Sequence, residues 1–167
     1  MEPAEVVDHI AERLASSGYK TKRVKLAGHD ALVGRRSDFR LEWIATRLHT
    51  FVIVFIVADL DDEIAEALTA ASQEYAIKHK GGLPRSLQTG SAAVAVFLSR
   101  ESRPNVHLWF SAEPTHRFAA LRFPLLIELD SWAPIYFRGR ALRGAVYMQH
   151  LRSVAGNIIS LDVRPAS

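Results

Sequence analysis

An arginine and a histidine stand two positions apart in an otherwise apolar segment, residues 41–58 (LEWIATRLHTFVIVFIVA). If this segment is a β-strand, Arg47 and His49 point to the same face of a sheet as Phe51. Buried polar side chains need partners. A guanidinium binds carboxylates and phosphates as a fork, and an imidazole titrates near neutral pH. The pair therefore predicts a pocket for an anionic or carboxylate ligand.

A purely structural role is the alternative for this pair. The two side chains would then lie past the edge of the core, or pair with acidic residues of this chain. The acids considered as partners are Asp38, Glu42 and Glu128. In that arrangement the strand carries no ligand site.

Two further polar pairs could join Arg47 and His49. The loop 79–90 (HKGGLPRSLQTG) connects a predicted helix to a predicted strand, and it carries Arg85 and Gln88. Binding residues are often found on loops that a rigid scaffold holds in place. His116 and Arg117 precede another predicted strand. If all six side chains converge, they form an anion-binding cleft; if not, the loop is only a connection. The candidate ligand-binding residues are Arg47, His49, Arg85, Gln88, His116 and Arg117.

Several kinds of chemistry lack their sequence motifs. There is no cysteine, so disulfides and thiolate chemistry are excluded. The seven histidines are well separated and form no H-x-x-x-H or H-E-x-x-H pair. The G-x-S-x-G, G-x-G-x-x-G and G-x-x-x-x-G-K-[ST] patterns are also missing. We therefore expect no metal site, no bound cofactor and no catalytic residue that the sequence can name.

Apolar periodicity and turn residues predict a single α+β domain over residues 1–162, followed by a frayed tail, 163–167. The expected order is helix, three antiparallel strands, helix, two or three strands and a C-terminal helix, in a two-layer arrangement of sheet and helix. Short links between neighbouring strands favour antiparallel pairing. The expected helices are 3–17, 59–80 and 140–161, and the expected strands are 19–26, 31–36, 41–58, 92–98, 118–129 and 135–137.

Two of these strands, 51–58 and 92–98, are apolar on both faces. An antiparallel sheet that is covered on one side alternates apolar and polar residues instead. A second copy of the chain could cover the other face, so we expect a homodimer. The alternative is that residues 100–116, which hold at most a short helix around Trp109, fold over that face within one chain.

The composition supports a soluble, folded protein. The longest apolar run, 51–58, is far shorter than the roughly 20 residues that a membrane-spanning helix needs. The amino-terminal segment is acidic and amphipathic, unlike a secretory signal. We therefore expect a cytoplasmic protein without a membrane partner.

We interpret the chain as a non-enzymatic homodimeric binding or regulatory module for a protein or a small anionic ligand. One alternative is a small enzyme, a hydrolase or lyase, with a pocket built on Arg47 and His49. The other is a weak nucleic-acid binder that uses the basic segments 20–25 and 35–40. Nucleic acid is not the expected partner, because a net charge of +3 is small for such proteins.

Overall fold

The computed structural model describes residues 1–40, 46–81, 89–117, 119–141 and 145–161. Within these ranges the chain forms four helices and six strands, and the α+β class predicted from the sequence is confirmed. The elements are α1 (Pro3–Ser16), β1 (Lys20–Leu26), β2 (His29–Arg40), β3 (Thr46–Ile56), α2 (Asp62–His79), β4 (Thr89–Ser99), α3 (Pro104–Ser111), β5 (Ala120–Glu128), β6 (Ala133–Ile135) and α4 (Ala145–Ile159).

All six strands belong to one mixed sheet, whose spatial order follows the sequence from β1 at one edge to β6 at the other. β1, β2 and β3 pair antiparallel, as predicted. β3, β4 and β5 pair parallel, because the connections that contain α2 and α3 carry the chain back to the same end of the sheet. β6 pairs antiparallel with β5. Short links thus gave the expected antiparallel pairs, and the helical connections gave parallel ones.

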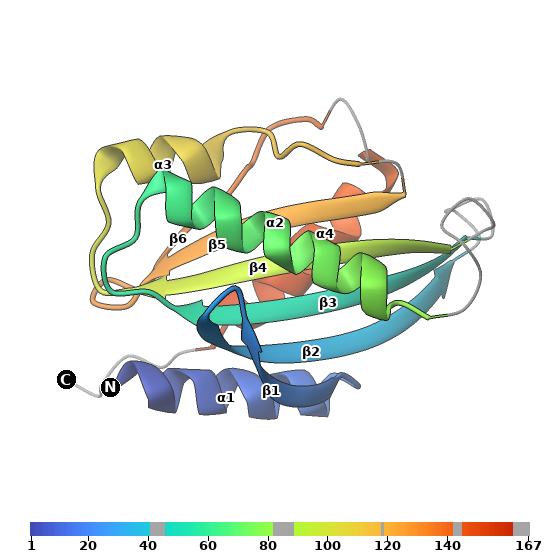
Figure 1. The fold of residues 1–167 in the computed structure, drawn as a ribbon, viewed down its shortest axis with the longest axis horizontal. Coiled ribbons are helices and arrows are strands. Elements are labelled where there is room, and N and C mark those ends of the chain that lie inside the picture. The colour runs from blue at the N-terminus through green and yellow to red at the C-terminus, as the bar shows by residue number, and fades with distance from the viewer. Residues whose placement is uncertain (41–45, 82–88, 118, 142–144, 162–167) are drawn as a thin grey trace.

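Helices lie against both faces of this sheet (Figure 1). α2 and α3 pack on one face, over a core that includes Phe51, Phe55 and Phe97. α1 and α4 pack on the other face, over a core that includes Val52 and Leu125. Because alternate residues of a strand point to opposite faces, the apolar residues on both sides of β3 and β4 are buried. A layer of helix on sheet is therefore present on each face.

The apolar second face that led us to expect a homodimer is thus covered within the chain. Val106 and Phe110 of α3 are fully buried, as in the alternative in which residues 100–116 fold over the sheet. The large apolar side chains that remain exposed in the described ranges are Met1, Ile56, Leu108 and Val146. The structure removes the reason for expecting a dimer, and the oligomeric state itself stays a prediction.

Local signals in the sequence explain where several elements begin and end. The Glu5 carboxylate accepts a hydrogen bond from the Glu2 backbone N–H (3.0 Å) and caps the start of α1. Ala27 and Gly28, with φ of 48° and 80°, form the two-residue turn between β1 and β2. Asp61 caps α2, because its side chain accepts a hydrogen bond from a backbone N–H of the first turn (2.7 Å).

Pro124 lies within β5 without interrupting the strand. It pairs in register with Ala95 of β4. On its other side, β6 pairs with β5 only at Leu126–Glu128. Pro124 therefore lies next to a stretch of β5 that is unpaired by any described strand, where a missing N–H is tolerated.

Candidate functional site

Arg47 and His49 lie near the start of β3, on the same face of the sheet as Phe51 and α2. The residues in register with His49 are Ser37 of β2 and Ser91 of β4. The Arg47 side chain is exposed and donates a hydrogen bond from Nη1 to Ser37 Oγ (3.3 Å). His49, in contrast, is only 7% exposed. The strand register thus places a buried imidazole between two serines.

The acids considered as partners for these two side chains are engaged elsewhere or lie outside the described residues. Asp38 forms an ion pair with Arg36 (3.1 Å). Glu128 is hydrogen-bonded at the opposite end of the parallel strands. Glu42 belongs to the undescribed range 41–45. In the structure, neither Asp38 nor Glu128 forms an ion pair or hydrogen bond with Arg47 or His49.

Two neighbouring polar atoms at this position are buried without a hydrogen-bond partner among the described residues: His49 Nδ1 and Ser91 Oγ. Their residues are direct neighbours across β3 and β4. A buried polar group left unpaired costs about 1–3 kcal/mol. Native structures contain few such groups, and those that occur often mark a site that a ligand or water completes. The two atoms are therefore the first sign of a binding site.

The surroundings of His49 are basic. Burial lowers the pKa of His49 below its ordinary value, and the nearby charges of Arg35, Lys80 and Arg47 lower it further. His49 is therefore a neutral imidazole at neutral pH. The charges come from β2, from the residue that follows α2 and from β3. We call Arg35, Arg47, His49, Lys80 and Ser91 the His49 cluster.

Arg35 is held in position although it is exposed. Its Nη2 donates a hydrogen bond to the backbone oxygen of Lys80 (2.6 Å), and its guanidinium lies 5.6 Å from the centre of the Phe51 ring. No carboxylate in the described part of the chain pairs with Arg35 or Arg47. Two guanidinium groups with unused N–H donors and no counter-charge within the described ranges suit the binding of an anion.

His116 and Arg117 lie just before β5, at the same end of the parallel strands as the His49 cluster, because Arg117 forms a β-bridge with Ala120, which is in register with Ser91. Arg117 pairs with Glu74 of α2. His116 Nδ1 accepts a hydrogen bond from the backbone N–H of Arg122 (3.3 Å), and its buried Nε2 has no partner among the described residues. Burial lowers the pKa of His116, Glu113 opposes this change and Arg122 adds to it. None of these contacts is made with a side chain of the His49 cluster.

Arg85 and Gln88, the other two predicted ligand residues, lie outside the described residues. The sequence analysis missed Arg35, Lys80 and Ser91. Arg35 and Ser91 join the cluster through the register of neighbouring strands, which no local pattern gives. The position of Lys80 indicates only a favourable charge at a helix end. The basic segment 35–40, named above as a possible nucleic-acid contact, is the signal that could have drawn attention to Arg35.

A second polar cluster lies at the other end of the parallel strands. Ser102 Oγ donates a hydrogen bond to Glu128 Oε1 (2.6 Å), and His107 Nε2 lies 2.9 Å from the same oxygen and 2.7 Å from Ser102 Oγ. In a catalytic triad the carboxylate and the hydroxyl contact opposite nitrogens of the imidazole. Here both contact Nε2. The cluster ties α3 and its preceding loop to the end of β5, and it lacks the geometry of a triad.

Replacing Glu128 by glutamine is expected to lower the free energy of unfolding by about 1 kcal/mol at neutral pH. Burial raises the pKa of Glu128, but hydrogen bonds from Ser102 and His107 lower it more, so the pKa lies below its ordinary value. At pH values above its ordinary pKa, such a carboxylate stabilises the folded state. This stabilisation is lost as the pH falls through the pKa that the carboxylate has in the folded state. The difference between wild type and variant should therefore shrink at acid pH.

Urea denaturation of both proteins between about pH 7 and about pH 3 measures this difference. The control is Glu12→Gln, which changes an exposed carboxyl of α1. A penalty for Glu128→Gln that stays constant over this range would contradict the prediction.

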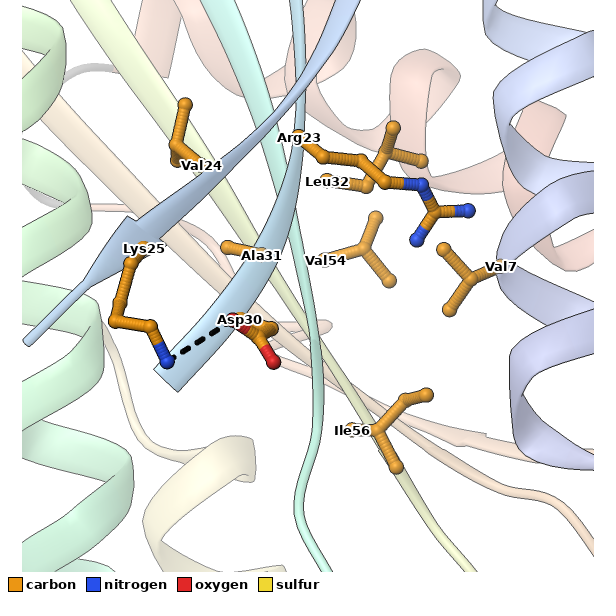
Figure 2. A pocket seen from close by; sticks show the side chains of 9 residues that line it. All are labelled: Val7, Arg23, Val24, Lys25, Asp30, Ala31, Leu32, Val54 and Ile56. Atoms are coloured by element: carbon orange, nitrogen blue, oxygen red, sulfur yellow. Dashed lines mark ion pairs between the residues drawn. The ribbon is translucent and has the colours of Figure 1, made fainter. Parts of the chain in front are cut away.

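A pocket of about 410 Å³ opens beside β1, between α1 and the strands β2 and β3 (Figure 2). Its charged side chains already have partners. Lys25 Nζ lies 3.2 Å from Asp30 Oδ1. The dashed line in Figure 2 marks this ion pair. Arg23 pairs with Asp8. None of its lining residues has a buried polar side-chain atom without a partner. We therefore place the candidate ligand site at the His49 cluster and not in this pocket.

In the ranges that the structure describes, no group of three or more histidine and acidic side chains could hold a metal ion. No described helix is both long enough and apolar enough to cross a membrane. The chain matches no protein-family model, and it matches no curated protein and no solved structure. A function for this protein must therefore be argued from its own residues.

Proposed function

We propose that the protein is a binding module for a small anionic ligand, which binds at the His49 cluster. The main support is the pair of buried, unpaired atoms, His49 Nδ1 and Ser91 Oγ, next to cations from three segments of the chain. Arg35 and Arg47 lack an acidic partner among the described residues. An anion would meet both needs at once, because it accepts hydrogen bonds and carries the missing negative charge.

The two kinds of group would have different roles. The exposed guanidinium groups of Arg35 and Arg47 attract the anion and bind it as forks. A neutral imidazole and a serine hydroxyl can each donate one hydrogen bond. His49 Nδ1 and Ser91 Oγ are covered by other atoms, so groups of the protein must move for the anion to reach them. We therefore expect a change in side-chain conformation on binding.

Ser91→Ala is expected to make the protein more stable, by up to about 1 kcal/mol, and to weaken its binding of inorganic phosphate. The variant removes a buried hydroxyl that has no hydrogen-bond partner among the described residues, so the cost of burying that unpaired group in the folded state disappears. With phosphate bound, the same hydroxyl would donate a hydrogen bond. Urea denaturation measures the first effect, and isothermal titration calorimetry with inorganic phosphate measures the second.

The matched control is Ser99→Ala, at the other end of β4. Ser99 is also buried, but its hydroxyl donates a hydrogen bond to the Glu101 backbone oxygen (2.8 Å). This variant should lose stability and bind phosphate as the wild type does. The proposed function is wrong if none of three anions, inorganic phosphate, sulfate and citrate, binds to the wild type at millimolar concentration.

The homodimer is not part of this proposal, because both faces of the sheet are covered within the chain. It remains an expectation from the sequence alone. Native mass spectrometry at micromolar concentration measures the oligomeric state, and the same spectrum shows any anion that stays bound.

A further inference from the structure

We infer that the ligand of the His49 cluster is a phosphate ester that carries a planar ring, of the class of the nucleoside monophosphates. This inference rests on the proposed function and concerns the part of the ligand beyond its anionic group. It starts from two stacked rings in the last turns of α2. The rings of Tyr75 and His79 have their centres 3.9 Å apart and planes 18° from parallel. Both side chains are partly exposed.

The stacked pair lies directly beside the His49 cluster, and Phe51 connects the two. The guanidinium of Arg35 lies 5.6 Å from the centre of the Phe51 ring. The Tyr75 ring meets the same Phe51 ring edge-on, with 6.0 Å between the centres. Arg35 also bonds the backbone oxygen of Lys80, the residue after His79. The groups that would bind a phosphate and the rings on which a base could stack are therefore neighbours.

The stacked pair is also held in a fixed orientation. His79 Nδ1 donates a hydrogen bond to the Tyr75 backbone oxygen (2.9 Å), which keeps the imidazole over the phenol ring. The Lys22 ammonium lies 5.9 Å from the centre of the Tyr75 ring and adds positive charge on the β1 side. Rigid aromatic groups flanked by cations are the usual means of binding a base next to its phosphate.

Simpler roles account for each part separately. A histidine in the last turn suits the helix dipole, and a tyrosine can cover the edge of a core. Neither role accounts for the rest of the His49 cluster. Among the described residues, His49 Nδ1 and Ser91 Oγ have no hydrogen-bond partner, and Arg35 and Arg47 have no acidic partner. A ligand with a phosphate at one end and a flat ring at the other would engage all of these groups.

The test is isothermal titration calorimetry of the full chain with inorganic phosphate, ribose 5-phosphate and adenosine monophosphate. We expect adenosine monophosphate to bind about 10-fold more tightly than ribose 5-phosphate, because of base stacking. His79→Ala should abolish that difference, and His79→Phe should keep it. Arg47→Gln should weaken the binding of all three compounds. Lys78→Ala, which changes an exposed neighbour of His79, is the control and should weaken binding far less than Arg47→Gln.

The outcomes separate this inference from the proposed function. Equal affinity for the three compounds would overturn the ring-binding inference and leave the anion site standing. No binding of any of them would overturn both. Tighter binding of a short single-stranded oligouridylate, with a steep loss of affinity as salt rises, would also overturn the inference, because the surface would then be an interface for single strands.

Discussion

Replacing Phe97 by alanine is expected to lower the free energy of unfolding by roughly 3–5 kcal/mol. Phe97 lies in β4 and is fully buried. Its ring contacts Phe55 of β3, with 5.5 Å between centres, and Phe110 of α3, with 5.2 Å between centres. The substitution removes the middle ring of this row. The neighbours cannot collapse into the space, because β4 is hydrogen-bonded on both sides within the sheet.

Urea denaturation followed by circular dichroism gives the free energy of unfolding of wild type and variant. The control is Leu108→Ala, which removes a side chain of α3 that is 75% exposed. That change should cost less than about 0.5 kcal/mol. A penalty for Phe97→Ala as small as that of the control would mean that α3 does not pack on the sheet in solution.

This row of rings also shows what the sequence could and could not predict. The apolar residues on both faces of strands 51–58 and 92–98 correctly indicated burial on both sides. The pattern does not say what covers each face. A helix of the same chain and a second copy of the chain would both pack against the same apolar residues of the sheet. The short helix around Trp109 was expected. Only its packing in the structure shows that Val106 and Phe110 complete the core on the face of the sheet that α2 and α3 cover.

The candidate site has a similar limit. Arg47 and His49 form one pair of basic residues, and His116 and Arg117 form another, and the sequence gives no reason to rank them. Arg117 forms an ion pair with Glu74, whereas Arg47 forms no ion pair with any described acid. This difference depends on where α2 crosses the sheet. Ionic partners far apart in sequence are set by tertiary packing, so local patterns could name candidates but could not choose among them.

Glu66→Ala is expected to lower the free energy of unfolding by about 2 kcal/mol. Glu66 of α2 receives two hydrogen bonds from Arg122 of β5, at 2.8 Å and 3.2 Å, one to each carboxylate oxygen. The Arg122 side chain is only 10% exposed, whereas that of Glu66 is 48% exposed. Removing the carboxylate leaves a buried guanidinium without its counter-charge, and Thr115 becomes its remaining side-chain partner among the described residues. Since water still reaches Glu66, the cost stays below that of a fully buried pair.

The two partners should respond unequally. Arg122→Met should cost less than Glu66→Ala, because methionine fills the buried space and water solvates the glutamate that remains. For the same reason the double variant, Glu66→Ala with Arg122→Met, should be more stable than Glu66→Ala alone. A double-mutant cycle in urea measures all three changes.

Glu74→Ala is the control for this cycle. It breaks the pair between Glu74 and Arg117, in which both side chains are exposed, so it should cost at most about 0.5 kcal/mol. If Glu74→Ala lowers the free energy of unfolding as much as Glu66→Ala does, the burial of Arg122 does not explain how much the Glu66–Arg122 pair stabilises the fold. If instead the double variant recovers stability, a buried arginine requires its acid here. Arg35 and Arg47 of the His49 cluster are exposed and have no acidic partner among the described residues, so their guanidinium groups do not require a carboxylate of this chain.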